Sequence, residues 1–140
     1  MESTVQAMVS GLNAPLDHDA LRATRTDDLI YQFLPESLGA PARNNEEWKE
    51  VFTQLKALFS SFEVTLRLCF YDTEARGACL HGKVDTQSPI GPVTMEFVFM
   101  IKFNEAGDKM ARIDEFFDSK VYTEFFGRVE EAMKQGGEHQ

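Results

Sequence analysis

Hydrophobic positions follow two spacings along this chain, one typical of helices and one typical of strands. Helical spacing of apolar residues predicts helices near residues 3–13, 17–23, 44–60 and 119–134. Alternating or continuous apolar runs predict strands near residues 27–34, 62–72, 76–86, 92–104 and 109–118. The order of elements is therefore helix, helix, strand, helix, a four-strand meander and a closing helix. It predicts an α+β fold, with residues 1–140 forming one domain.

The segment from Gly91 to Phe126 organises the predicted sheet. Its first strand, Pro92–Phe103, is rich in β-branched and aromatic residues and too apolar for a solvated edge, so we expect it in a central position. The Gly-, Asn- and Asp-containing turn Asn104–Asp108 then sends the next strand back antiparallel. Asp118 and Ser119 end that strand and are suited to cap the closing helix.

Composition narrows the classes of function. With 12 Phe and 43% hydrophobic residues in 140, the chain can bury a core, and so many Phe residues also suit a pocket for a large apolar ligand. The formal net charge of −9 and the scattered Lys and Arg disfavour binding to nucleic acid or to an anionic membrane. No apolar run reaches the ~18 residues of a membrane-spanning helix, so a cytoplasmic location is expected. Cys69 and Cys79 lie in strand-like apolar runs, which favours buried free thiols.

Four short strings within this element order resemble a known family. Ala111-Arg-Ile-Asp-Glu-Phe-Phe-Asp118 is similar to the last strand of the SnoaL-like polyketide cyclases, in the nuclear-transport-factor-two-like superfamily. Arg25-Thr-Asp-Asp28, Leu34-Pro-Glu-Ser-Leu38 and Arg43-Asn-Asn-Glu-Glu-Trp48 resemble the small fungal isomerases of meroterpenoid pathways such as those for terretonin and austinol. The likeness covers about residues 3–134. It implies a cone-shaped barrel, in which three N-terminal helices cover a strongly curved antiparallel sheet and a C-terminal helix follows.

Three residues are candidates for acid–base catalysis. By resemblance, Asp118 occupies the position of the SnoaL-like catalytic Asp; the alternative is a plain helix cap. His81 is the only histidine inside a predicted strand, and the fungal isomerases use a histidine on this part of the sheet; the alternative is a structural histidine. Glu63 starts the first long strand, where the resemblance calls for an acid; the alternative is a solvated strand-end glutamate. Together they predict proton transfer to a bound substrate.

Strand alternation conflicts with this assignment. It places the polar candidates on one face of the sheet: Glu63, His81, Glu96 and Asp118. It places apolar residues on the opposite face, which the helices should cover: Val64, Leu66, Leu68, Phe70, Leu80 and Phe97. For the acids to line the pocket, a bulge must shift the register or the pocket must open at the strand ends. Gly82 and Gly91 are the candidate bulge or bend sites.

The expected reaction needs no cofactor, and the expected substrate is a hydrophobic small molecule. The sequence has no phosphate-binding loop, no Ser-His-Asp motif and no metal-ligand spacing. The resemblance implies an isomerase or cyclase that rearranges an oxidised terpenoid–polyketide intermediate by proton transfer. The alternatives are an aldol cyclase or dehydratase of a plain polyketide, and a non-catalytic adaptor module. Four residues are the expected substrate contacts: Arg43, Asn45, Tyr31 and Phe116.

A homodimer is also expected. The outer side of the predicted sheet carries four residues that offer a self-complementary surface: Thr65, Arg67, Thr94 and Val98.

Overall fold

A computed structural model describes residues 1–13 and 16–138 of the chain. The described residues form five helical segments: α1 (Glu2–Asn13), α2 (His18–Arg22), the short 3-10 helix η1 (Glu36–Leu38), α3 (Asn45–Leu58) and α4 (Ser119–Glu138). The same part of the chain forms five strands: β1 (Arg25–Leu34), β2 (Ser61–Asp72), β3 (Gly77–Ser88), β4 (Gly91–Phe103) and β5 (Met110–Phe117). The predicted α+β element order is therefore confirmed, with η1 added and the ends of elements shifted by a few residues.

The five strands form one mixed sheet in the order β1-β5-β4-β3-β2. The predicted antiparallel meander from β2 to β5 is confirmed. Strand β4 lies at the centre of the five-stranded sheet, as expected. The prediction of a wholly antiparallel barrel is wrong, because β1 pairs with β5 in parallel, as in Tyr31 beside Ile113. Between β1 and β2 the chain passes through α3 and not through a hairpin turn. Strand β1 is therefore free to run in either direction beside β5. The sheet also stays open, with β1 and β2 as its edges.

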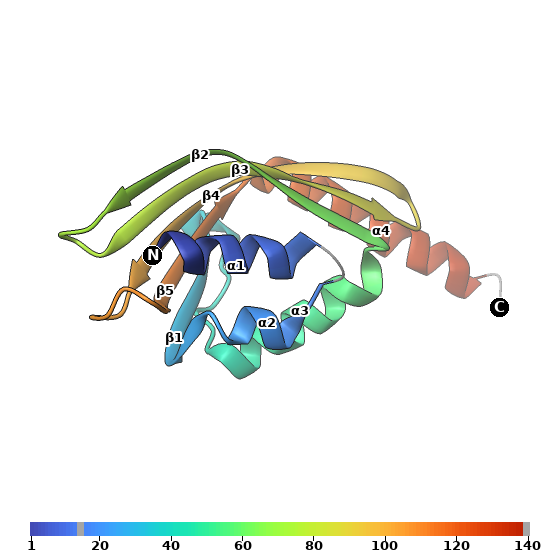
Figure 1. Cartoon of the computed structure of the whole chain (residues 1–140). Coiled ribbons are helices and arrows are strands. Elements are labelled where there is room, and N and C mark those ends of the chain that lie inside the picture. Colours follow the sequence, from blue (N-terminus) through green and yellow to red (C-terminus); the bar gives the residue numbers. More distant parts are fainter. Residues whose placement is uncertain (14–15, 139–140) are drawn as a thin grey trace.

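Helices α1, α2 and α3 lie on the concave side of the curved sheet (Figure 1). The start of α3 is fixed by the predicted capping box, in which the Asn44 side chain accepts from the Glu47 amide and the Glu47 carboxylate accepts from the Asn44 amide. Trp48 and Phe52 on α3 are buried against the sheet. The side chains with the lowest exposure include Leu21, Leu29, Leu80, Met110 and Ile113. The core therefore fills the space between the concave face and the three helices.

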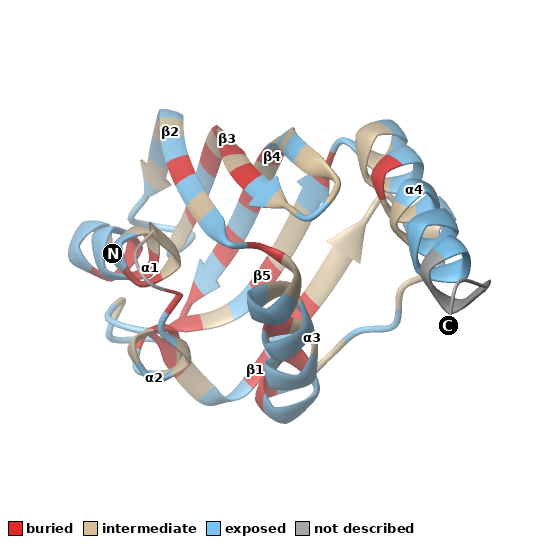
Figure 2. Cartoon of the chain, turned by 90° about the vertical axis from the view of Figure 1, so that its right-hand side faces the viewer, coloured by how far each residue is buried: buried red, intermediate tan, exposed pale blue. Residues whose placement is uncertain are grey.

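Helix α4 packs against the body of the protein with aromatic side chains from its first two turns, and Arg128 in the third turn donates to the Ile90 carbonyl. Phe125 is buried and stacks on Phe59 with 5.6 Å between ring centroids, and Tyr122 lies 4.9 Å from the Phe117 ring. Most of the rest of α4 is exposed (Figure 2), including Met133, whose exposed fraction is 73%. None of the helices in the described residues is long and apolar enough to cross a membrane.

A bulge at Arg67 interrupts the alternation of side chains along β2, so alternate residues that face the helices before Arg67 face outward after it. The pairing register between β2 and β3 shifts between Leu66 and Leu68, opposite Gly82. Leu68 and Phe70 consequently lie on the outer face, where their exposed fractions are 50% and 62%. The prediction that they share a face with Val64 is wrong for this reason. The bulge therefore lies in β2 opposite Gly82, and Gly82 itself pairs regularly with Phe97 on β4.

The same register places Phe70 beside Cys79 on the outer face. Both cysteines are free, as expected, but Cys79 is exposed and Cys69 is only partly buried. The prediction of two buried thiols is therefore wrong, because alternation along β3 turns Cys79 away from the helices.

We predict that Gly82→Ala destabilises the protein. An added Cβ would lie 2.3 Å from the Thr65 carbonyl oxygen, and a backbone atom in a paired strand cannot move aside cheaply. The free energy of unfolding should fall by about 2 kcal/mol in urea denaturation. Gly127→Ala is the control, since nothing lies within 4 Å of a Cβ there and helix propensity favours Ala, so stability should rise slightly. Equal stability of wild type and Gly82→Ala would contradict the close approach.

Candidate active site

A cavity of about 290 Å³ lies between α3, α4 and the concave face of the sheet. This volume is near the lower end of the roughly 300–1,000 Å³ typical of small-molecule sites. Its walls are mainly aliphatic and aromatic side chains, among them Phe33, Leu38, Leu55, Phe59, Phe62, Met95, Phe97, Phe117 and Phe126. Two charged residues are part of the described lining: Glu115 and Arg43. The cavity therefore presents one carboxyl and one guanidinium in otherwise apolar surroundings.

Glu115 is held by Tyr31. The two residues come from the neighbouring parallel strands β5 and β1, and the Tyr31 hydroxyl donates a hydrogen bond to Glu115 Oε1. Tyr31 is 3% exposed, and its ring lies 5.5 Å from the Trp48 ring and 5.3 Å from the Arg25 guanidinium carbon. Packing on several sides therefore fixes the hydroxyl that orients the carboxyl.

The surroundings of the Glu115 carboxyl raise its pKa towards neutral pH. Burial raises the pKa of Glu115 to about 7, while the Tyr31 hydrogen bond and the Arg25 charge act in the lowering direction. Burial, followed by the charge of Glu115, raises the pKa of Tyr31 well above its ordinary value, so Tyr31 stays a neutral donor. A carboxyl with a pKa near 7 can both accept a proton and return it at physiological pH.

Arg43 reaches the cavity from the segment before α3. Its backbone forms a bridge with Tyr31, with N–O distances of 2.7 and 2.8 Å, so its position is tied to the strand that supplies the donor to Glu115. The guanidinium carbon lies 5.3 Å from the centroid of the Phe33 ring. The buried Nη1 atom has no hydrogen-bond partner in the described part of the protein. A substrate oxygen would satisfy this donor.

Asp118, the first predicted catalytic residue, caps α4. Its Oδ1 accepts from the Val121 amide at 3.2 Å, and its own amide donates to the Glu96 carbonyl at 3.0 Å. The side chain is exposed and is not part of the described cavity lining. These contacts are those of a helix cap. The catalytic role of Asp118 remains a prediction.

His81 and Glu63 lie on the outer face of the sheet. His81 Nε2 is 2.6 Å from Glu96 Oε2, and Arg67 approaches the same oxygen at 3.7 Å. Glu63 is exposed and pairs across the sheet with Asp85. In residues 1–13 and 16–138, no hydrogen bond or ion pair joins any two of Asp118, His81 and Glu63. The bulge at Arg67 does not turn these residues inward, and their catalytic role also remains a prediction.

The predicted substrate contacts separate into two groups. Arg43 lines the cavity, and Tyr31 stands directly behind Glu115. Asn45 instead ties α3 to β1, because its side-chain amide donates to the carbonyls of Thr26 and Asp27 at 2.9 and 3.3 Å. Phe116 is 48% exposed on the outer face.

Glu115 was missed by the sequence analysis, although the sequence contains a signal for it. Strict alternation in β5 places Glu115 on the same face as Ile113 and Phe117, both of which are buried. An acid on a buried strand face is unusual and often functional.

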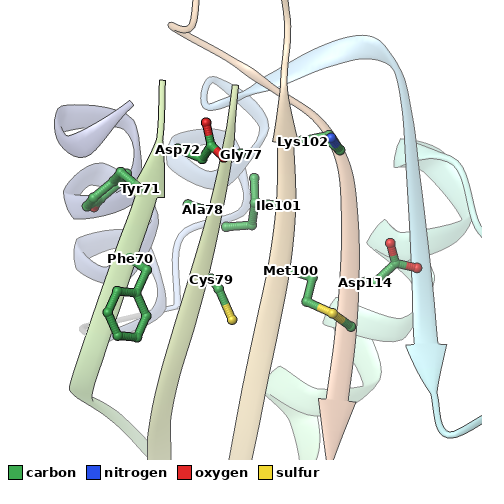
Figure 3. Close-up of a pocket in the computed structure, with 10 residues that line it drawn as sticks. All are labelled: Phe70, Tyr71, Asp72, Gly77, Ala78, Cys79, Met100, Ile101, Lys102 and Asp114. Carbon is green, nitrogen blue, oxygen red and sulfur yellow. The ribbon is translucent and has the colours of Figure 1, made fainter. Parts of the chain in front are cut away.

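A second hollow, of about 350 Å³, lies on the outer face (Figure 3). Phe70, Cys79 and Met100 line it, and all three are exposed. It is a surface depression rather than an enclosed site. Among the described residues, no group of three His, Cys, Asp or Glu side chains is placed to hold a metal ion.

Comparison with known proteins gives relatives that are small fungal proteins. The sequence is 34% identical over 103 residues to a monooxygenase of Claviceps purpurea, which is 74% of this chain and 66% of that protein. It is 32% identical over 111 residues to the monooxygenase AgnL5 of Paecilomyces divaricatus, which is 79% of this chain and 69% of that protein. The matched regions span about two thirds of the length of these relatives. No family model matches the sequence.

Solved structures with this fold include two fungal proteins and one bacterial protein. The BvnE pinacolase of Penicillium brevicompactum superposes with a TM-score of 0.86 at 24% identity, covering 91% of this chain and 89% of BvnE. AusH of Aspergillus nidulans gives 0.75 at 25% identity, covering 84% and 85%. A SnoaL-like protein of Shewanella denitrificans gives 0.72 at 9% identity, covering 88% and 93%. The predicted fold family is thereby confirmed.

We predict that Glu115→Gln stabilises the protein at high pH only. The pKa of Glu115 in the folded protein lies above its ordinary value of 4.5, so ionisation costs stability as the pH rises from about 4.5 through about 7. Gln keeps an acceptor for Tyr31 and cannot ionise. Its free energy of unfolding should exceed that of wild type by about 3 kcal/mol at about pH 8 and nearly match it at about pH 4.5. A gain of equal size at both pH values, in urea denaturation, would contradict the buried acid.

Proposed function

We propose that this chain is an enzyme of secondary metabolism, because it belongs to the family of the fungal monooxygenase AgnL5 of Paecilomyces divaricatus and has a SnoaL-like fold. Its proposed reaction is the cofactor-free isomerisation or cyclisation of an oxidised terpenoid–polyketide intermediate. The observation that carries the proposal is a carboxyl with a pKa near 7, held by Tyr31 in an apolar cavity.

The proposed mechanism needs one base and one cation. The Glu115 carboxylate removes a proton from a carbon next to a substrate carbonyl, and the pair of electrons moves onto the carbonyl oxygen. The Arg43 guanidinium faces the resulting enolate oxygen and offsets its charge. The neutral Glu115 then returns the proton to a different carbon, or the enolate closes a ring onto a second carbonyl. Atoms and electrons balance without an external oxidant.

The cavity lining favours a substrate with fused or prenylated rings. Phe33, Phe117 and Tyr122 present aromatic surfaces, and Glu115 and Arg43 are the charged groups of the described lining. An apolar ring system with one oxygen-rich edge would place that edge between the carboxyl and the guanidinium.

A second candidate activity is oxygenation, because the relatives from Claviceps purpurea and Paecilomyces divaricatus carry the name monooxygenase. The same base would produce a substrate carbanion. Dioxygen would then convert a CH₂ at that carbon into a carbonyl with loss of water, the substrate itself supplying the electrons. An aldol cyclase and a non-catalytic adaptor are the remaining alternatives.

Isotopes separate these activities. The purified protein is incubated with extract from a producing strain that lacks it, in ²H₂O or under ¹⁸O₂, and products are followed by mass spectrometry. Isomerisation gives a product of unchanged formula, which gains deuterium only to the extent that the proton held by Glu115 exchanges with solvent before its return, and oxygenation gives a product that contains ¹⁸O. A product that has lost water and contains no ¹⁸O indicates the aldol route. Unchanged extract in all arms would overturn the enzymatic proposal.

We also propose that the outer face forms a homodimer. Five large apolar side chains are exposed there: Ile30, Leu68, Phe70, Met100 and Phe116. Charge pairs of both signs surround them, so a second copy could match the surface by a two-fold rotation.

The predicted test of the dimer is Phe70→Glu. Light scattering of the wild type at micromolar concentration should give about twice the chain mass of 15.9 kDa, and the variant should give about 15.9 kDa. Met133→Glu is the control, because Met133 is 73% exposed but lies on α4. A wild-type mass near 15.9 kDa would contradict the proposed dimer.

The catalytic assignment predicts a ranking of variants. Glu115→Gln should lower turnover by at least about a hundredfold, since it removes the only carboxyl in the described cavity lining. Asp118→Asn and His81→Ala test the assignment made from the sequence, and the same assay decides between the two sets. Glu115→Gln with wild-type turnover, beside slow Asp118→Asn, would overturn the cavity mechanism.

A further inference from the structure

Arg25 is a buried cation that has no ion-pair partner among the residues that the structure describes. Its residue is 3% exposed, and arginine is rarely buried so completely unless it is paired. In residues 1–13 and 16–138 the ion pairs involve other side chains, and Arg25 Nε has no hydrogen-bond partner. Burial lowers the pKa of Arg25 to about 10, which still leaves it charged near neutrality. A residue with this cost calls for an explanation other than stability.

Aromatic rings connect Arg25 to the cavity. The guanidinium carbon lies 4.1 Å from the centroid of the Trp48 ring and 5.3 Å from that of Tyr31. The far end of Tyr31 carries the hydroxyl that bonds to Glu115. Tyr31 therefore has a cation against its ring and a carboxyl at its hydroxyl.

We propose that Arg25 is a positioning residue for Glu115: against the ring of Tyr31, it holds the hydroxyl in place and supplies the positive charge that the ionised carboxyl faces. The proposal rests on the proposed function, in which Glu115 is the acid–base group. Arg25 does not line the described cavity and so acts through Tyr31.

The sign of the effect follows from the charges around Glu115. The titratable or charged groups from the elements packed against it are Tyr31 and Arg25 on β1, Arg43 before α3, and Tyr122 on α4. A nearby cation favours the ionised carboxyl, so Arg25 counteracts the burial that raises the pKa of Glu115. Removing that charge should move the titration of Glu115 to higher pH.

A purely structural Arg25 would behave differently. Its stacking on Trp48 helps to join β1 to α3, so substitution could lower stability without touching the titration. The titration midpoint of Glu115 therefore separates the two roles, and thermal stability does not.

The experiment is a carbon-13 NMR titration of the full chain, labelled at the glutamate side-chain carboxyl. Glu115→Gln identifies the Glu115 resonance. Arg25→Met should raise the midpoint by about 1 pH unit, and Arg25→Lys should restore it to near the wild-type value. Arg22→Met is the matched control, because Arg22 is a neighbouring cation that pairs with the exposed Asp27, and its loss should leave the midpoint in place.

Three results decide the matter. An unchanged midpoint in folded Arg25→Met overturns the proposal. If Arg25→Met does not fold, Arg25→Gln carries the test: it keeps a planar polar end group and removes the charge, so the midpoint must rise, and an unchanged midpoint overturns the proposal. A wild-type midpoint near the ordinary glutamate value of 4.5 instead defeats the proposed function itself, whatever Arg25 does.

Discussion

The hydrogen bond from Tyr31 to Glu115 is the interaction on which the candidate site depends. It exists because β1 runs parallel to β5, which brings the donor and the acceptor to adjacent strands on the same concave face. The same strand holds Arg43 by a backbone bridge and carries Arg25. Without β1 beside β5, the Glu115 carboxyl would face the helices with no donor, and an unsatisfied acid of this kind costs several kcal/mol. One pairing therefore positions all the charged groups of the site.

The buried Arg25 and the half-buried Glu115 oppose folding. A guanidinium and a carboxyl that do not touch gain less attraction than a direct ion pair and still lose their hydration. The protein offsets the loss with aromatic faces around Arg25 and with one hydroxyl on Glu115. Apolar residues at both positions would be expected to give a more stable core. Retention of polar groups in the core is the pattern found where function opposes stability.

Much of the fold is predictable from local patterns, because caps and periodicity act within a few residues. The Asn44–Glu47 box locates α3, and the apolar run of β4 indicates its central place. The partner of β1 is not encoded locally, so its parallel pairing could not be predicted. The bulge opposite Gly82 depends on how two strands meet, and it reverses the facing of Phe70. Strand alternation alone places Glu115 on the same face of β5 as buried residues. The family resemblance instead indicates Asp118, which in the fold caps α4 and is exposed to solvent.

The division of the sheet into two faces limits the chemistry that the cavity can perform. On the outer face, His81, Glu96 and Arg67 are partly exposed and form charge pairs of the kind that contributes little in water. On the inner face, Glu115 is the one carboxyl in the described lining. A single carboxyl that removes a proton from a bound ring and returns it to another carbon approaches that ring from one side only. In the proposed isomerisation, the proton should therefore leave and arrive on the same face of the substrate, which is a stereochemical consequence of having one acid–base group in an apolar cavity.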